Sequence, residues 1–248
     1  MTELAIIGGT GLTSLKNLDI TRREVVHTPF GEPSGPLTHG VLSGKEVVFL
    51  ARHGSGHTIP PHRINYRANL WALNNTGVKR VVAVAAVGGI SDDLPAGMLA
   101  IPDQIIDYTS ARENTFFDDG LTHVTHIDFT DPYCGELRQL LIRASEAARL
   151  DCVPGGTYGT TQGPRLETAA EIERMARDGC TMVGMTGMPE AALARELELC
   201  YATCAVVVNK AAGRGEGPIS MHDIEQSVKQ GMEKVRMVLE HLVPLLGP

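Results

Sequence analysis

Short apolar runs rich in β-branched residues alternate with helical patterns, and this alternation is the feature that most restricts how the chain can fold. Each run ends in glycine or a polar turn, as buried strands do. The runs cover Leu4–Ile7, Val47–Ala51, Val81–Val87 and Ala202–Val208. Thr38–Leu42 and Gln104–Asp107 are typical of further, more exposed strands. Strands that alternate with helices favour an α/β fold.

Helical periodicity lies between and after these strands. One apolar face runs through Asn65–Asn75 and another through Pro132–Leu150. The last helix is the clearest, because Ser220 is a good N-cap and apolar residues recur at helical spacing until Pro244 ends the run. With no linker, repeat or low-complexity tract, we expect one domain over residues 1–248.

The segment Tyr108–Phe129 interrupts this regular pattern. It is polar and aromatic, and it contains His123 and His126. Long loops in compact domains are often functional, but a solvated connector would have the same composition. Both interpretations stay open from the residues alone.

Charge and cysteine content argue against several classes of protein. The net charge is −7 with no basic cluster, which disfavours a nucleic-acid binder but not an anion in a local pocket. No signal peptide and no segment long enough to span a bilayer are evident, so we expect a cytoplasmic protein without membrane contact. The sequence has 5 cysteines, an odd number, and contains no CxxC motif. This predicts buried free thiols rather than disulfides or zinc ligands.

Anion-binding residue types gather at the ends of the expected strands, where α/β proteins bind ligands. The turn Gly8–Gly11 offers backbone N–H groups and the Thr10 hydroxyl. It lacks a full GxGxxG and a following ribose-binding acid, so phosphate is favoured over NAD, with a plain turn as the alternative. Arg52 and His53 end another strand, and arginine has a planar fork that suits phosphate oxygens. Gly-Ser-Gly separates His53 from His57 and disfavours a metal site there.

Further small and polar residues stand at strand or helix ends. Ala85 and Ala86 precede a Gly-Gly pair, where a ligand can approach the backbone closely. Glu167 is near a helix start, where it is either a first-turn acid or a ligand contact. Asn209 ends a very apolar strand and is either a turn former or a reader of a ligand. Together with Thr186, these groups suit a planar heterocycle beside an anion.

These motifs resemble those of the trimeric 5'-methylthioadenosine and purine nucleoside phosphorylase family. The resemblance runs from Leu4 to about Leu246, and the block Ala51–Leu73 is most similar to the methylthioadenosine branch. IIGGTG, QGPRLETAAE and GMTGMPEA support the same assignment. The resemblance implies a phosphorylase/hydrolase-like fold with a mixed central sheet flanked by helices. It also implies a homotrimer or hexamer that uses inorganic phosphate as co-substrate, without metal or organic cofactor.

The resemblance further assigns roles to individual residues. Phosphate contacts are expected from Thr10, Arg52, His53, Ala85, Ala86 and Thr186. Base contacts are expected from Glu167, Met185, Asn209 and Ala211, and contacts to the sugar or its 5' group from His57, Met221, Ile224 and a neighbouring subunit's His126. In this family phosphate attacks the anomeric carbon through an oxocarbenium-like state. Asn209 is the candidate catalytic donor to N7 of the departing purine, because an amide donates without releasing its proton.

Departures from the methylthioadenosine branch determine the expected base. That branch carries aspartate at the positions of Asn209 and Ala211. A carboxylate would place a second acceptor against a 6-oxo group, whereas an amide can donate to both N7 and O6. Glu167 matches the acid that accepts the N1 proton in oxopurine-specific members. We therefore expect hypoxanthine or guanine rather than adenine.

The start of the last helix determines the expected sugar. Ungapped comparison places Met221 where inosine and guanosine phosphorylases have a histidine for the 5'-hydroxyl, and Ile224 follows one turn later. Both form an apolar wall suited to a methylthio group, although both also fit ordinary core positions of an amphipathic helix. A shift of one residue would place His222 there instead.

The expected reaction is therefore phosphorolysis of S-methyl-5'-thioinosine to hypoxanthine and 5-methylthioribose 1-phosphate. An inosine/guanosine phosphorylase is the alternative, and a methylthioadenosine phosphorylase is less favoured. Two alternatives come from other classes: a non-catalytic nucleoside-binding protein and a nicotinamide-dependent oxidoreductase built on GGTG.

Overall fold

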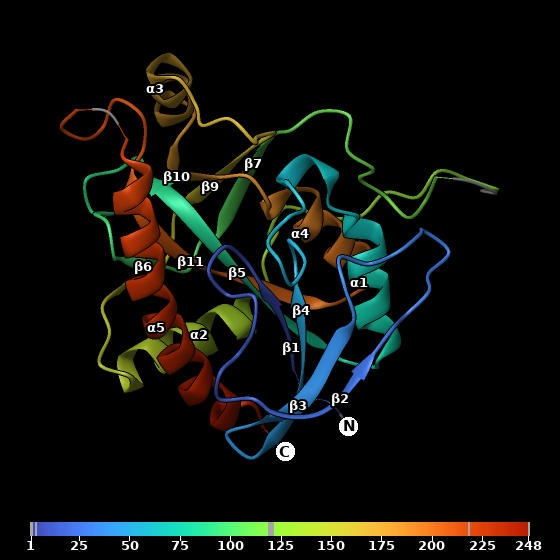
Figure 1. Ribbon diagram of the computed structural model, residues 1–248. Helices are drawn as coiled ribbons and strands as arrows, with labels where there is room; N and C mark the ends of the chain where they lie inside the picture. Colours follow the sequence, from blue (N-terminus) through green and yellow to red (C-terminus); the bar gives the residue numbers. More distant parts are fainter. Residues whose placement is uncertain (1, 3, 119–121, 218, 248) are drawn as a thin grey trace.

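The computed structural model consists of an 11-stranded sheet with helices on both faces (Figure 1). It describes the whole chain except residues 1, 3, 119–121, 218 and 248. The strands are β1 (Leu4–Gly8), β2 (Asp19–Glu24), β3 (Leu37–Leu42), β4 (Lys45–Ala51), β5 (Arg80–Gly89), β6 (Leu99–Ala100), β7 (Gln104–Tyr108), β8 (Cys152–Val153), β9 (Thr157–Thr161), β10 (Cys180–Gly184) and β11 (Cys200–Lys210). The helices are η1 (Pro61–Arg63), α1 (Tyr66–Asn75), α2 (Gly135–Ala147), α3 (Ala169–Arg177), α4 (Gly187–Glu196) and α5 (Met221–Leu245).

The sheet is mixed, as expected. Its main path runs β2-β3-β4-β1-β5-β10-β9-β7, and β11 pairs with β5 and β6. β1 is parallel to β4 and β5, and β11 is parallel to β5, whereas β10 is antiparallel to β5. The central strands β1 and β5 are almost continuously apolar because helices cover both of their faces.

Two helix pairs cover the two faces of this sheet. α2 and α5 pack on one face and α1 and α4 on the other (Figure 1). The stripe of α5 that carries Val235 and Leu239 is fully or almost fully buried against the sheet, and burial of each such side chain stabilises the fold by roughly 1.5–3 kcal/mol. Gly231 allows the close approach, since a Cβ there would lie 2.2 Å from Cγ1 of Val206.

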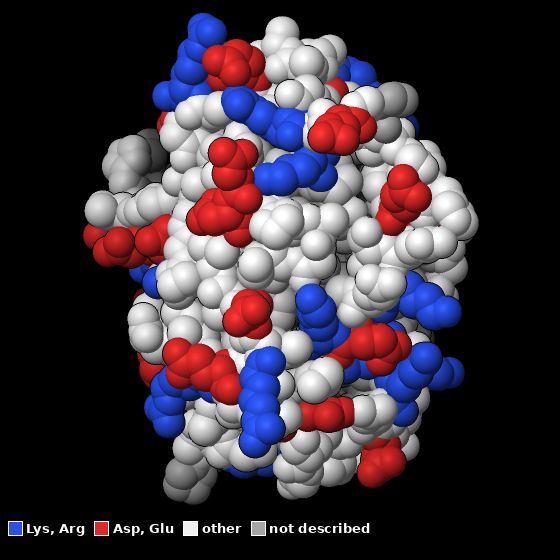
Figure 2. Space-filling model, turned by 90° about the vertical axis from the view of Figure 1, so that its left-hand side faces the viewer, with Lys and Arg blue, Asp and Glu red and all other residues white. Residues whose placement is uncertain are grey.

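The long segment after β7 forms neither helix nor strand in the parts that the structure describes, 109–118 and 122–134. The loop predicted for Tyr108–Phe129 is therefore confirmed at 109–118 and 122–129, whereas Tyr108 is the last residue of β7 and α2 begins at Gly135 rather than at Pro132. None of the helices formed by the described residues is both long and apolar enough to cross a membrane. On the side that includes α5, acidic and basic side chains are interspersed rather than gathered by sign (Figure 2).

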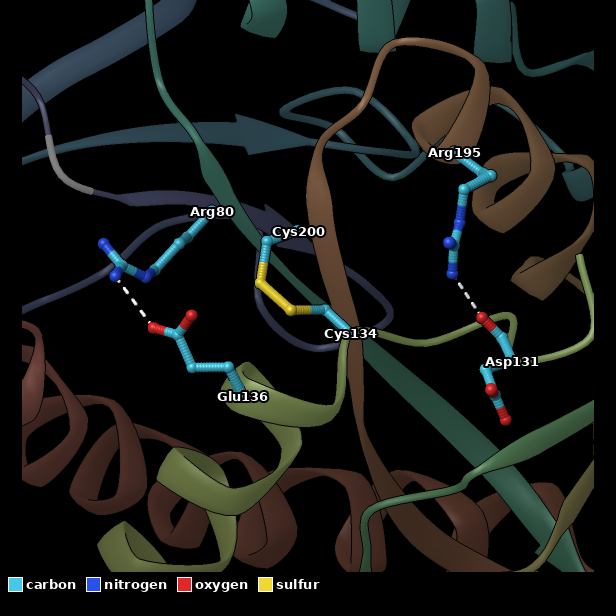
Figure 3. The surroundings of a disulfide bond; sticks show 6 residues. All are labelled: Arg80, Asp131, Cys134, Glu136, Arg195 and Cys200. Carbon is cyan, nitrogen blue, oxygen red and sulfur yellow. Dashed lines mark hydrogen bonds and ion pairs between the residues drawn. A yellow bond between two sulfur atoms is a disulfide. The ribbon is translucent and has the colours of Figure 1, made fainter. Parts of the chain in front are cut away.

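A disulfide joins Cys134, just before α2, to Cys200 at the start of β11 (Figure 3). Their Cα atoms are 5.1 Å apart, and the Cys134 N–H donates to the Tyr201 carbonyl at 2.8 Å. The prediction of five buried free thiols is therefore wrong for these two and confirmed for Cys180 and Cys204, while Cys152 is free but only partly buried. The pairing partners are 66 residues apart, and only the sheet brings them together, so their spacing in the sequence gave no signal.

Candidate active site

A cavity of about 180 Å³ opens where β1, β4, β10 and β11 end, beside the start of α5. Strand ends of parallel sheets are the usual ligand site of α/β proteins. The cavity is lined by Gly9, Thr10, Arg52, His53, Pro61, Ala85, Ala86, Val87, Gly88, Leu166, Glu167, Val183, Gly184, Met185, Thr186, Val208, Asn209, Ala211, Ala212, Ile219, Met221, Ile224 and Val228. Every residue predicted to contact phosphate or base is in this set. The fold thus gathers side chains from positions 10 to 228 into one site.

At the part of the cavity where phosphate is expected, around Gly9, Thr10 and Thr186 (the phosphate end), backbone atoms are closely packed. A Cβ at Gly9 would lie 2.4 Å from the Val84 carbonyl oxygen and 3.1 Å from Nη1 of Arg52, so glycine is required there. Thr10 follows in the turn after β1, and Thr186 follows β10 just before α4, which is kinked at Met188. Backbone N–H groups and hydroxyls at such positions favour an anion.

The guanidinium group of Arg52 is engaged differently from the sequence expectation. Its Nε and Nη2 donate to the Glu190 carboxylate at 2.7 and 2.8 Å, and Nη1 donates to the Val84 carbonyl at 2.8 Å. Arg52 is 1% exposed and Glu190 is fully buried. Burial opposes the charge of Arg52, but Glu190 outweighs it and the pKa of Arg52 rises. The fork therefore holds Glu190, and a phosphate contact from Arg52 stays a prediction that depends on its other N–H groups.

Glu190 also accepts a hydrogen bond from the Tyr201 hydroxyl at 2.8 Å. Burial is the main cause that raises the pKa of Tyr201, so the tyrosine stays protonated and able to donate. Neither the pairing of Arg52 with Glu190 nor the hydrogen bond from Tyr201 to Glu190 was predicted from the sequence. An acid inside the otherwise small and apolar GMTGMPEA motif was the available signal for Glu190, because buried acids need a partner.

His53, a buried residue that lines the cavity, is neutral. Its Nδ1 is 2.8 Å from the Ile59 carbonyl, which requires a proton on Nδ1 and leaves Nε2 as an acceptor. Burial and then Arg52 lower the pKa of His53 to about 4. His57 lies outside the cavity lining, with its ring centroid 4.6 Å from that of His53. The predicted sugar contact of His57 remains a prediction.

At the part of the cavity where the base is expected (the base end), the acid is Glu167 and the amide is Asn209. Glu167 precedes α3, whose N-cap is Thr168 and whose first-turn acid is Glu171, so Glu167 is not the helix-dipole acid of the alternative interpretation. The Thr161 hydroxyl donates to Oε1 of Glu167 at 2.6 Å. Nδ2 of Asn209 donates to the Lys210 carbonyl at 2.6 Å, which leaves its second N–H and its oxygen for a ligand.

Two predicted residues for the 5' group line the cavity. Met221 is 62% exposed at the first position of α5, and Ile224 follows beside it. His222 points elsewhere and shares a 2.8 Å hydrogen bond with Gln226, so the ungapped alignment agrees with the cavity lining. His126 is exposed in the long segment and does not line this cavity, and its contact with a neighbour's sugar remains a prediction.

The chain belongs to the phosphorylase superfamily, whose family profile matches residues 3–244. It is 53% identical over 243 residues to the probable S-methyl-5'-thioinosine phosphorylase of Pseudomonas syringae pv. tomato, covering 98% of this chain and 99% of the relative. It is 45% identical to the 6-oxopurine nucleoside phosphorylase of Pyrococcus furiosus, covering 99% and 94% of the two chains. The solved methylthioadenosine phosphorylase of Schistosoma mansoni in complex with adenine matches with a TM-score of 0.95 and 32% identity, covering 100% and 92% of the two chains.

Proposed function

We propose that this phosphorylase cleaves S-methyl-5'-thioinosine with inorganic phosphate, releasing hypoxanthine and 5-methylthioribose 1-phosphate. One observation carries the proposal: Asn209 and Glu167 line the same cavity as Thr10 and Thr186. A base-reading amide and acid thus share one cavity with an anion-binding turn. The names of relatives at 53% identity support the same substrate.

The reaction requires the cavity to bind the phosphate anion at one end and to stabilise the negative charge of the leaving purine at the other. Phosphate, held at Thr10 and Thr186, would attack the anomeric carbon as the glycosidic bond breaks. The negative charge that develops on the leaving purine would be stabilised by an N–H of Asn209 at N7, while the Glu167 carboxylate accepts a hydrogen bond from N1–H. The purine would then take up one proton from water to leave as neutral hypoxanthine. Asn209 must release the Lys210 carbonyl if both of its N–H groups are to donate to N7 and O6.

The second candidate is an inosine/guanosine phosphorylase, which the 6-oxopurine relatives favour. Met221 and Ile224 at the cavity argue against it, because an apolar wall leaves a 5'-hydroxyl without a partner. Methylthioadenosine is disfavoured by Asn209 and Ala211, where the sequence lacks the aspartates of that branch.

A substrate panel tests the proposal. Base release is measured for methylthioinosine, inosine and methylthioadenosine, each with and without phosphate. We expect phosphate-dependent release that is fastest for methylthioinosine. Fastest release from methylthioadenosine would contradict the base assignment, and binding without release would indicate a nucleoside-binding protein. A fluorescence titration with NADH tests the oxidoreductase alternative, for which saturable binding would be required.

We further propose a homotrimer without metal or organic cofactor, acting in the cytoplasm. The disulfide Cys134–Cys200 is the feature against that compartment, because cytoplasmic thiols are normally kept reduced. Fractionation of cells into cytoplasm and exported protein tests the location. Light scattering of the purified protein tests the number of subunits.

A further inference from the structure

Arg112, in the long segment after β7, donates hydrogen bonds to the backbone of two stretches that carry cavity-lining residues. Its Nη1 donates to the carbonyls of Met185 at 2.9 Å and Met188 at 2.6 Å. Its Nη2 donates to the carbonyls of Thr161 at 3.2 Å and Gln162 at 2.9 Å. These carbonyls belong to two separate stretches, one at the end of β9 and one that runs from just after β10 into the start of α4. One side chain thus ties two strand ends together.

Two side chains complete the surroundings of Arg112. Its Nε donates to Oε1 of Gln162 at 3.0 Å, and Nη1 lies 3.2 Å from the Tyr66 hydroxyl, with the guanidinium 5.5 Å from the centre of the Tyr66 ring. All of these acceptors are neutral oxygens. A charge placed among neutral dipoles orients them, and arginine does so with five N–H groups in one plane. Lysine carries its three N–H groups on one nitrogen, so it does not reproduce donors that diverge from three nitrogens.

The stretches that Arg112 holds carry the predicted ligand contacts. Met185 and Met188 flank Thr186, which lines the phosphate end, and Met185 lines the base end. Thr161, held through its carbonyl, uses its hydroxyl to donate to Glu167. We infer that Arg112 is a positioning residue that fixes the base and phosphate walls relative to each other. This inference rests on the proposed use of the cavity for a nucleoside and phosphate.

Arg112→Lys tests the inference, with Arg138→Lys as its matched control. Arg138 donates to three backbone carbonyls, against four for Arg112. They belong to Ile101, Pro102 and Pro154, none of which lines the cavity. Both variants should lose thermal stability. Well below either melting temperature, we expect Arg112→Lys to lower kcat/KM roughly 100-fold and to raise KM for both nucleoside and phosphate, since a displacement of about 1 Å has effects of this size. Arg138→Lys should keep both KM values and kcat within about twofold of wild type.

Two further measurements keep the result decisive. Gln162→Leu removes the side-chain oxygen that accepts from Nε of Arg112 and from the Ser110 N–H, and it keeps the four backbone carbonyls that Arg112 holds. It should therefore fold and lower kcat/KM roughly tenfold. Each comparison uses the nucleoside that the wild-type protein cleaves fastest. If the proposed substrate is wrong, the wild-type substrate panel shows it, and the comparison of Arg112→Lys with wild type is unaffected. If wild type cleaves none, the affinity for hypoxanthine by calorimetry replaces kcat/KM. Wild-type kinetics in folded Arg112→Lys, or equal losses in Arg138→Lys, would overturn the inference.

Discussion

At the scale of single residues, we expect the choice of base to depend on Asn209. Asn209→Asp replaces the N–H donors with an acceptor that would face O6 of an oxopurine. We expect kcat/KM for methylthioinosine to fall roughly 100-fold, while the preference shifts toward methylthioadenosine. Steady-state kinetics on both nucleosides measure this shift. Asn209→Ala, which removes the donor without adding an acceptor, should lower both activities, and an unchanged preference in Asn209→Asp would rule out Asn209 as the discriminator.

His53 makes the stability of the fold depend on pH. Its pKa is about 4 in the folded chain, because of burial and then Arg52, against an ordinary value of 6.5. Between pH 6.5 and 4 the unfolded chain therefore binds a proton that the folded chain does not, and stability falls as pH falls. The contribution of His53 is roughly 3 kcal/mol over that window. Urea unfolding at pH 7.5 and 4.5 should show a smaller loss for His53→Asn than for wild type, and equal losses would contradict the assignment.

The residues that line the cavity could be predicted from the sequence, whereas Glu190 and Arg112, which hold those residues in place, could not. Thr10, Thr186 and Asn209 stand in motifs whose position after a strand already indicates a ligand. Arg52 was predicted for its fork, but Glu190 occupies that fork from 138 residues away along the chain. Arg112 had no signal, because its partners are backbone carbonyls, which any sequence supplies. Side-chain chemistry can be read from a sequence, whereas contacts to distant backbone require the fold.

At the scale of elements, we expect the first turn of α5 to decide which 5' group the cavity accepts. Met221→Ala should lower the ratio of kcat/KM for methylthioinosine to that for inosine roughly tenfold, since one side-chain contact of this size contributes about 1–3 kcal/mol. His222→Ala is the control, because His222 contacts Gln226 outside the cavity lining. A ratio that changes in His222→Ala and not in Met221→Ala would show that the helix register relative to the family is shifted by one residue.

Elements with a strong apolar signal were predicted, and elements without one were not. The strands that became β1, β4, β5 and β11 were all predicted within a few residues of their bounds, because burial on both faces selects continuous apolar runs. β2 was not predicted, since its sequence DITRRE is polar and mostly exposed at the sheet edge. α5 passes Pro244, its predicted end, and stops at Leu245. Proline lacks a backbone donor but does not prevent the last residues from keeping helical geometry.

At the scale of the whole molecule, the disulfide ties the start of β11 to the segment before α2. Cross-linking residues 66 positions apart stabilises a fold by about 4 kcal/mol through the unfolded chain. Cys134→Ser should therefore lower the melting temperature by roughly 10 °C, measured by differential scanning calorimetry without reductant. Cys152→Ser, which changes a free thiol, is the control. Equal melting temperatures for wild type and Cys134→Ser would mean that the bond does not form in solution.

The assembly prediction is that a neighbouring subunit's His126 completes each site. His126 is exposed, so His126→Ala should fold and yet lose activity if the contact is real. Asn209→Ala should also lose activity, but in its own cavity. Co-expression of the two variants in one trimer then pairs an intact cavity with an intact His126 in about a quarter of the sites, by random association around a closed ring.

That recovery separates an interface site from a self-contained one. We expect the mixed protein to regain roughly a quarter of wild-type activity per site, while each variant expressed alone stays low. Mixing the purified homotrimers without dissociation is the control and should recover nothing. If His126→Ala alone keeps wild-type activity, the cavity needs no neighbour, and the exposed segment that carries His126 is only a connector.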